Sequence, residues 1–138
     1  MRRVALLIGV CIAVASTLTI VGQQAPKDLS PIMKDIAHSV QELNRAMAAT
    51  GAPIVVKEAE NLQARFTEAE AFFKAQNAQD AVGWAHAQAE SAAAIAKTAQ
   101  ANNLDGAKAP IKAMTDRCNT CHMVHREQLP DKTFRFKP

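Results

Sequence analysis

The chain has 138 residues, with 16 basic and 13 acidic side chains, and it is rich in Ala, Glu, Gln and Lys but contains no Tyr. This length suits one domain with its own core, and the composition predicts an all-α fold. The near balance of charge gives no electrostatic preference for nucleic acid, so a nucleic-acid-binding function is not expected.

The N-terminus predicts export from the cytoplasm. Two arginines precede an apolar run at 4–21. We interpret residues 1–22 as a secretory signal cleaved after Gly22, which predicts a periplasmic location for the remaining 116 residues. The run is also near the lower limit for a membrane span, so an uncleaved membrane anchor is the alternative. Cys11 lies inside the run without a small residue just before it, and is not interpreted as a lipidated cysteine.

A first helix is predicted over 30–49, after a lead-in at 23–29. Ser30 is a suitable N-cap, the proline that follows it suits the first turn, and Gly51 supplies a stop. Apolar residues recur at helical spacing along one face of this segment: Ile32, Met33, Ile36, Ala37, Val40, Leu43 and Met47.

Two further helices are predicted over 53–76 and 80–101. In the first, apolar residues alternate by four and three, an a/d pattern typical of bundle packing: Val55, Ala59, Leu62, Phe66, Ala69 and Phe73. The second begins at Asp80, a candidate N-cap, and its inner face is mostly alanine: Ala85, Ala89, Ala92, Ala96 and Ala99. Such a stripe allows either close approach of another helix or room for a bulky cofactor.

A fourth helix is predicted over 105–129, followed by a basic tail at 130–138. Pro110 removes a backbone donor and clashes with the preceding turn, so the regular helix either starts near Ala109 or bends there. Four helices with short connections predict an up-down-up-down bundle spanning 30–129.

The fourth helix carries Cys118-Asn-Thr-Cys121-His122, the C-x-x-C-H pattern of c-type haem attachment. Positions i, i+3 and i+4 share one side of a helix, so two sulfurs and one imidazole converge on one flat cofactor. The pattern predicts one haem c, with Cys118 and Cys121 as covalent tethers and His122 as the proximal iron ligand. This interpretation agrees with the predicted export, because haem c is attached outside the bacterial inner membrane, where a C-x-x-C without haem could oxidise to a disulfide.

Two other chemistries fit part of the pattern. A dithiol redox motif expects a βαβ setting, which the sequence does not offer. A Cys₂His₂ zinc site would use Cys118, Cys121, His122 and His125 from one helix, whereas tetrahedral sites normally draw ligands from two elements. Haem attachment is therefore the favoured interpretation.

The bundle topology directs attention to the first helix for a second iron ligand. The start of that helix and the end of the fourth lie at the same end of the bundle, and Met33 faces inward there. Met33 is either that ligand or an ordinary core methionine. His38 points almost oppositely and is expected in solvent. His86 is a weaker candidate, and His125 either binds a haem propionate or is a partly buried imidazole.

The chain resembles class II c-type cytochromes, the cytochrome c′ group and its low-spin relatives. The shared features are four helices, C-x-x-C-H close to the C-terminus, and Arg126 four residues after His122. The start Ser-Pro-Ile-Met-Lys-Asp-Ile resembles the low-spin branch, in which an early methionine binds the iron. The resemblance implies that Met33 is the sixth ligand and that Arg126 contacts a propionate or the haem edge. His125 departs from the family, which more often carries an aromatic residue there.

These features predict a mono-haem carrier that passes single electrons between periplasmic redox proteins. The alternative is a five-coordinate cytochrome c′-type protein that binds NO or CO on the iron. A peroxidase-like enzyme is ranked last, because it needs a distal acid or base for which His86 is a weak candidate; an enzyme is not expected. The tail, with Lys132, Arg135 and Lys137, either docks an acidic redox partner near the haem edge or is a frayed terminus. The family also implies a homodimer through the first two helices.

Overall fold

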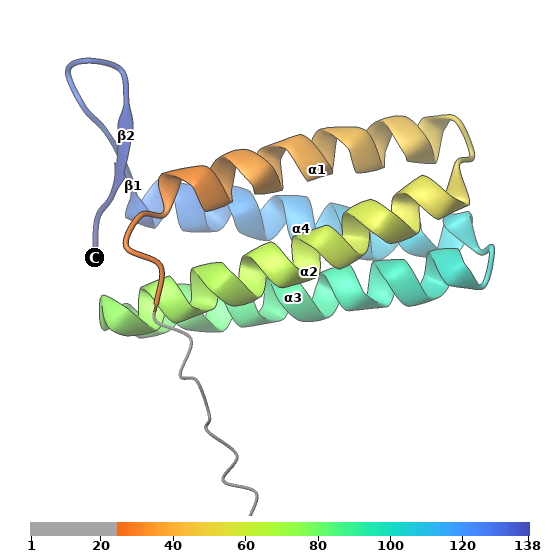
Figure 1. Ribbon diagram of the computed structural model, residues 1–138, viewed down its shortest axis with the longest axis horizontal. Helices are drawn as coiled ribbons and strands as arrows, with labels where there is room; N and C mark the ends of the chain where they lie inside the picture. Colours follow the sequence, from red (N-terminus) through yellow and green to blue (C-terminus); the bar gives the residue numbers. More distant parts are fainter. Residues whose placement is uncertain (1–24) are drawn as a thin grey trace, which may run out of the picture.

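The computed structural model describes residues 25–138, which form four α-helices followed by a β-hairpin (Figure 1). Consecutive helices run antiparallel, so the prediction of an all-α four-helix bundle is confirmed. The predicted signal at 1–22 lies outside the described residues. The elements are α1 (Ser30–Ala48), α2 (Ala52–Ala75), α3 (Gln79–Gln100), α4 (Leu104–His125), β1 (Arg126–Gln128) and β2 (Phe134–Phe136).

The three loops between helices share one backbone geometry. Each places one residue in the left-handed region, namely Thr50, Asn77 and Asn102 with φ of 53°, 58° and 55°. The amide of the following residue then donates back to the preceding helix over 2.8–3.1 Å, which is the Schellman motif. Asparagine tolerates this conformation, but the β-branched Thr50 is strained in it. Gly51, predicted as the stop, has a negative φ and instead precedes α2.

Two of the predicted N-caps are wrong. Ser30 is the first helical residue, and its amide donates to an aspartate side chain two residues earlier. Asp80 lies inside the first turn of α3, where its Oδ1 accepts the amide of Ala81 at 2.9 Å. In α4 the side chain of Asn103 does cap the helix, because it accepts a first-turn amide at 2.9 Å. Asp80 still favours the α3 start, since a negative charge there complements the helix dipole.

The densest part of the core lies between α2 and α3, which run side by side along their whole length (Figure 1). The predicted seam of α2 and the alanine stripe of α3 are both buried. Small alanine side chains allow the two helices to approach closely, while larger α2 side chains such as Leu62 and Phe66 fill the space between them. Within residues 25–138, no helix combines the length and apolar character needed to cross a membrane.

The fourth helix starts within one residue of its predicted position at 105 and differs from its prediction at the C-terminal end. It begins at Leu104 and continues through Pro110, so the predicted alternative of a start near Ala109 is wrong. Proline in this position leaves the carbonyl four residues earlier without its helical donor, a local cost that the helix tolerates near its N-terminus. The helix ends at His125, and the predicted continuation to 129 is wrong.

The residues after His125 form a hairpin instead. β1 pairs antiparallel with β2, and Lys137 donates its amide to the His125 carbonyl at 2.8 Å. The Phe136 ring packs against Phe72 and Phe73, with centroid distances of 5.6 and 5.1 Å. Burying this ring on the end of the bundle favours the hairpin, whereas another helical turn of Arg-Glu-Gln would bury little apolar surface.

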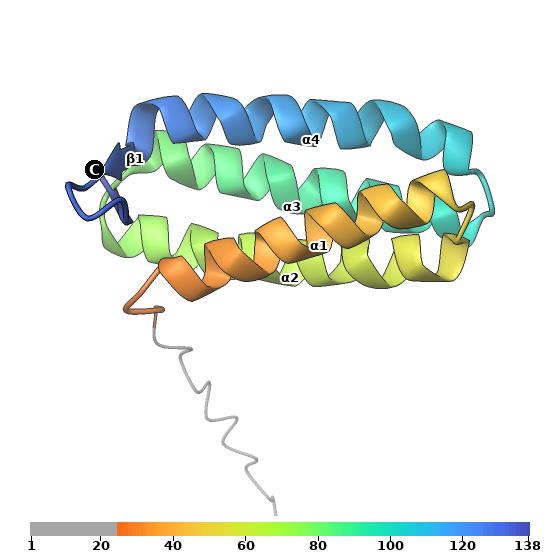
Figure 2. The ribbon, with the colours of Figure 1, turned by 90° about the horizontal axis from the view of Figure 1, so that it is seen from above.

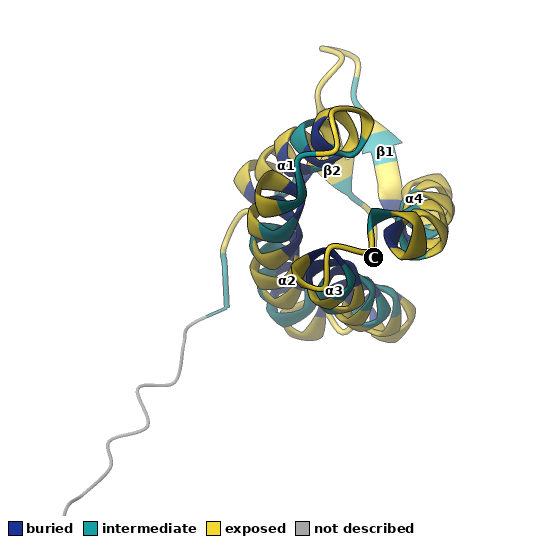
Figure 3. Ribbon diagram, turned by 90° about the vertical axis from the view of Figure 1, so that its right-hand side faces the viewer, coloured by how far each residue is buried: buried dark blue, intermediate teal, exposed yellow. Residues whose placement is uncertain are grey.

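In a four-helix bundle the first and fourth helices usually pack against each other, but here α1 and α4 have few direct contacts. α1 packs mainly on α2, and α4 packs mainly on α3. Seen from above and along the bundle, α4 stands apart from α1, with the hairpin near one end of the seam between them (Figures 2 and 3). Only three of the 22 residues of α4 are buried, compared with eight of 22 in α3. The α1–α4 seam is therefore the loosely packed side of the bundle.

Candidate functional site

The C-x-x-C-H segment occupies the last two turns of α4, on the helix with the fewest buried residues. Cys118 and Cys121 are both free thiols and both half-buried, while His122 is exposed. Their helical spacing places the three side chains on one side of α4. The structure thus presents two thiols and one imidazole together at a partly covered helix surface.

Both thiols are electrostatically disfavoured as thiolates. Burial raises the pKa of Cys118, against an opposing hydrogen bond from Gln88. Burial also raises the pKa of Cys121 to about 11, helped by the nearby charges of Cys118 and Asp80. Dithiol redox motifs depend on a lowered thiol pKa, so this environment argues against that alternative.

The imidazole of His122 is favoured in its neutral form. Although the residue as a whole is exposed, partial burial of its ring lowers its pKa first, and the positive charge of Arg126 lowers it further. Neutral imidazole is the form that binds metal ions, so His122 is available as a ligand near neutral pH. Arg126 itself lies with its guanidinium carbon 3.5 Å from the centroid of the Phe134 ring. Its predicted contact with a propionate or haem edge stays a prediction.

Met33 lies in the first turns of α1, at the same end of the bundle as the C-x-x-C-H segment (Figures 1 and 2). It is half-buried and packs against the core cluster, as does Cys118. α1 and α4 are the two helices that border the open seam. The assignment of Met33 as an iron ligand stays a prediction, but its helix and its end of the bundle are those that the assignment needs.

His125 is a buried structural residue, 6% exposed. Its Nε2 lies 3.1 Å from Asp80 Oδ2 and its Nδ1 lies 2.7 Å from the Lys137 carbonyl oxygen. The ring stacks on Phe136 and meets Trp84 edge-on, at centroid distances of 5.1 and 5.7 Å. Both nitrogens are occupied by acceptors, so the partly buried imidazole is the alternative that the structure supports. His125 ties α3, α4 and the hairpin together.

The remaining candidates lie on the surface. His38 is exposed, as predicted. The His86 side chain is 60% exposed and lies 3.3 Å from Glu70 and 3.6 Å from Glu90. Among residues 25–138, no three His, Cys, Asp or Glu side chains are grouped so that they could hold a metal ion.

The chemistry of the side chains in the segment fits a group held on α4 by two thioethers and one imidazole. The neighbouring face of α3 is mostly alanine, and those alanines are buried. Gln88, in this same face, is 3% exposed, and its Oε1 has no hydrogen-bond partner among the described residues. The donor set of two neutral thiols and one neutral imidazole matches thioether attachment with axial ligation. The sequence reasoning missed Gln88, although a polar residue three after Ala85 and four before Ala92 was a visible signal.

Two hollows lie along the α1–α4 side at the opposite end of the bundle. One, of about 360 Å³, is lined by Met47, Ile111 and lysines of α4, and the other, of about 420 Å³, reaches the loops. Neither includes a residue of the C-x-x-C-H segment. They do not mark the candidate site.

No protein-family model, no curated protein and no solved structure matches this chain.

Proposed function

We propose that the protein is an exported mono-haem c-type cytochrome that carries single electrons between redox proteins of the periplasm. The observation that supports this most strongly is the placement of Cys118, Cys121 and His122 together on the poorly covered end of α4. Cys118 and Cys121 would hold the haem covalently, and His122 would bind its iron. When bound, the haem supplies reversible one-electron chemistry at its iron.

The role proposed for Met33 follows from its position at the same end of the bundle. A thioether ligand from α1, opposite an imidazole from α4, would close the iron coordination and leave no open site. It would also link the two helices that otherwise have few contacts. A closed, low-spin iron suits electron transfer, because little ligand rearrangement accompanies the redox change.

Absorption spectra of the purified protein in both redox states test this assignment. We expect low-spin, six-coordinate spectra for the wild type. Met33→Ala should become five-coordinate or water-ligated and show a lower reduction potential, because the Met ligand raises the potential. Met47→Ala is the matched control, since Met47 is also half-buried in α1 but lies at the other end. High-spin wild-type spectra, or rapid CO binding, would instead favour the five-coordinate gas-binding protein.

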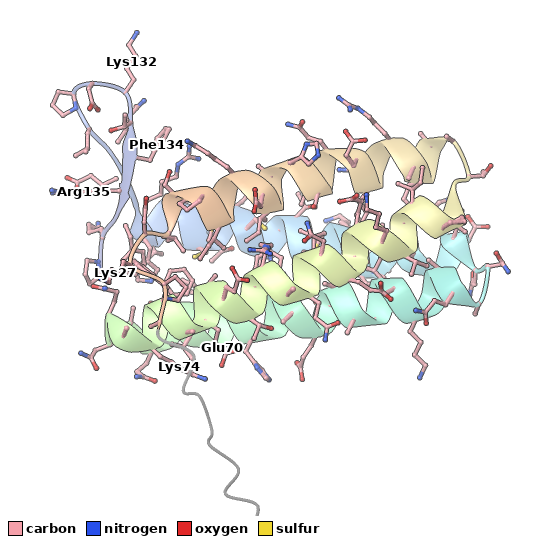
Figure 4. All side chains as sticks on the ribbon, viewed as in Figure 1. Lys27, Glu70, Lys74, Lys132, Phe134 and Arg135 are labelled. Atoms are coloured by element: carbon pink, nitrogen blue, oxygen red, sulfur yellow. The ribbon has the colours of Figure 1, made fainter. Side chains whose placement is uncertain are left out.

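The hairpin is the proposed docking surface for an acidic redox partner. Lys132 and Arg135 project from it away from the helices (Figure 4). The Phe134 ring beside them is 47% exposed, and Arg135 is paired with Glu127 at 2.6 Å. An apolar residue among basic side chains suits a transient, charge-steered contact. Electron-transfer rates should fall with ionic strength, and rates that are independent of salt would contradict this surface.

A further inference from the structure

Gln88 is the polar exception on the buried face of α3. It is 3% exposed and lies among side chains that are otherwise entirely apolar: Ala81, Ala85, Ala89, Ala92, Ile95, Ala96 and Ala99. Placing a carboxamide here removes it from water, which costs free energy unless its polar atoms find partners. A residue of this kind in an alanine stripe therefore requires a physical reason.

The amide nitrogen of Gln88 has two partners, and both belong to α4. Nε2 donates to the Met114 carbonyl at 2.8 Å and to Cys118 Sγ at 3.0 Å. These two acceptors match the two hydrogens of the amide. The orientation of the carboxamide is fixed, because the opposite one would set its oxygen against the Met114 carbonyl oxygen. Gln88 thus spans α3 to α4 at one of the two cysteines of the C-x-x-C-H segment.

The oxygen of the same amide shows that this arrangement is not optimised for stability. Gln88 Oε1 is buried without a partner among the described residues, which typically costs about 1–3 kcal/mol. The Met114 carbonyl does not need Gln88, because a helix already gives it the amide of Cys118. An apolar side chain of similar size would pack here without an unpaired oxygen. The specific contribution of Gln88 is its hydrogen bond to the sulfur.

We propose that Gln88 is a positioning residue for haem attachment, which orients the Cys118 sulfur and continues to donate to it after the thioether has formed. This inference rests on the proposed function. In the step it serves, the sulfur bonds to the inner carbon of a haem vinyl group, and the thiol proton ends on the outer carbon. The vinyl double bond becomes a single bond, so atoms balance and no electron is gained or lost. The retained hydrogen bond would withdraw electron density from the thioether sulfur on the haem edge, which would favour reduced iron and raise the reduction potential.

Gln88→Met tests this role, because methionine keeps the size of the side chain and removes the donor. The variant should carry covalent haem on a smaller fraction of its chains, and its loaded fraction should show a lower reduction potential. Thermal stability should stay level or rise, since the unpaired Oε1 is removed as well. Asn61→Leu is the control: Asn61 donates to Ser39 at 2.7 Å between α1 and α2. It should lose stability without changing attachment or potential.

The Cys118→Ala background makes the test specific. With haem held by Cys121 alone, adding Gln88→Met should have no further effect on the potential. A potential that still falls in this background would overturn the proposal, as would a Gln88→Met protein with wild-type attachment and potential. If the wild type itself carries no covalent haem, the proposed function fails first. If it does and Gln88→Met is indistinguishable from it, only the role of Gln88 fails.

Discussion

The α2–α3 pair and the α1–α4 seam are opposite sides of one bundle, and they are built differently. α2 and α3 each bury eight residues, and their apolar seams interlock along the full length. α4 buries three of 22 residues and has few contacts with α1. The chemistry-bearing residues lie on the loose side, while the tight side supplies the rigidity that positions them. The proposed haem would therefore be held on the side of the bundle that buries fewer residues.

The largest effect should come from truncating one side chain on each side of the bundle. Leu62→Ala removes a fully buried side chain of α2 and should lower the free energy of unfolding by about 2–5 kcal/mol. Ile111→Ala removes a half-buried side chain of α4 and should cost about 1 kcal/mol or less, because the exposed part contributes little. Chemical denaturation of the protein without haem measures both. Equal losses would show that the two sides are packed alike.

The next comparison is between the two phenylalanines of β2. Only the Phe136 ring packs against the end of the bundle. Phe136→Ala should lower the free energy of unfolding by about 1–2 kcal/mol, since the ring is half-buried against α2 and His125. Phe134→Ala is its neighbour in the same strand and should cost less, because that ring is exposed and gains mainly the contact of Arg126. Circular dichroism during denaturant titration distinguishes them. If Phe134 proves the more costly truncation, the hairpin does not cap the bundle.

The fold was predictable where periodicity alone determines burial. The seam of α2 and the alanine stripe of α3 follow helical spacing, and every predicted member is buried. The hairpin was not predictable, because Arg126–Gln128 carries no β-strand pattern and its pairing depends on where Phe136 meets the bundle end. The N-cap predictions were wrong for a similar reason. Ser30 and Asp80 have suitable side chains, but the preceding loops determine where α1 and α3 start.

The candidate site was predictable only in part. The C-x-x-C-H motif picks out three residues and predicts their chemistry, and helical spacing places them on one side of α4. The partner of Cys118 was missed, because Gln88 lies 30 positions earlier and meets it only through the register of α3 against α4. The hydrogen-bond partners of His125 could not be predicted either, because they come from α3 and from the last residues of the chain.

A pH experiment tests the contact between Asp80 of α3 and His125 of α4, which also contacts the Lys137 carbonyl after the hairpin. The amide of Ala81 and then His125 hold the pKa of Asp80 below its usual value of 3.8. The stabilisation by this carboxylate is therefore present above its usual pKa and is lost as the pH falls through the lower folded-state pKa. Asp80→Ala should be less stable than the wild type at about pH 7, and the gap should narrow by about pH 3. Gln79→Ala, in the same turn, should show no such convergence; a constant gap for Asp80→Ala would contradict the link.

The smallest effect concerns the loop that joins α1 to α2. Thr50 is β-branched and holds φ at 53°, a conformation that asparagine provides in the two equivalent loops. Thr50→Asn should therefore stabilise the protein by about 0.5–1 kcal/mol. The reverse change, Asn77→Thr, should destabilise it by a similar amount. Thermal melts of both variants compare the loops, and a destabilised Thr50→Asn would show that the threonine makes a compensating contact.

The most direct test of the account is the intact mass of the protein, purified from the periplasm of cells that assemble c-type haem and measured after denaturation. The account predicts the mass of the polypeptide plus one haem, retained because two thioethers survive unfolding. Cys118→Ser/Cys121→Ser should show the polypeptide alone while keeping its helical circular dichroism. A wild-type mass of the polypeptide alone, or of the polypeptide with a Cys118–Cys121 disulfide, would contradict the central claim that the loose end of α4 is a haem attachment site.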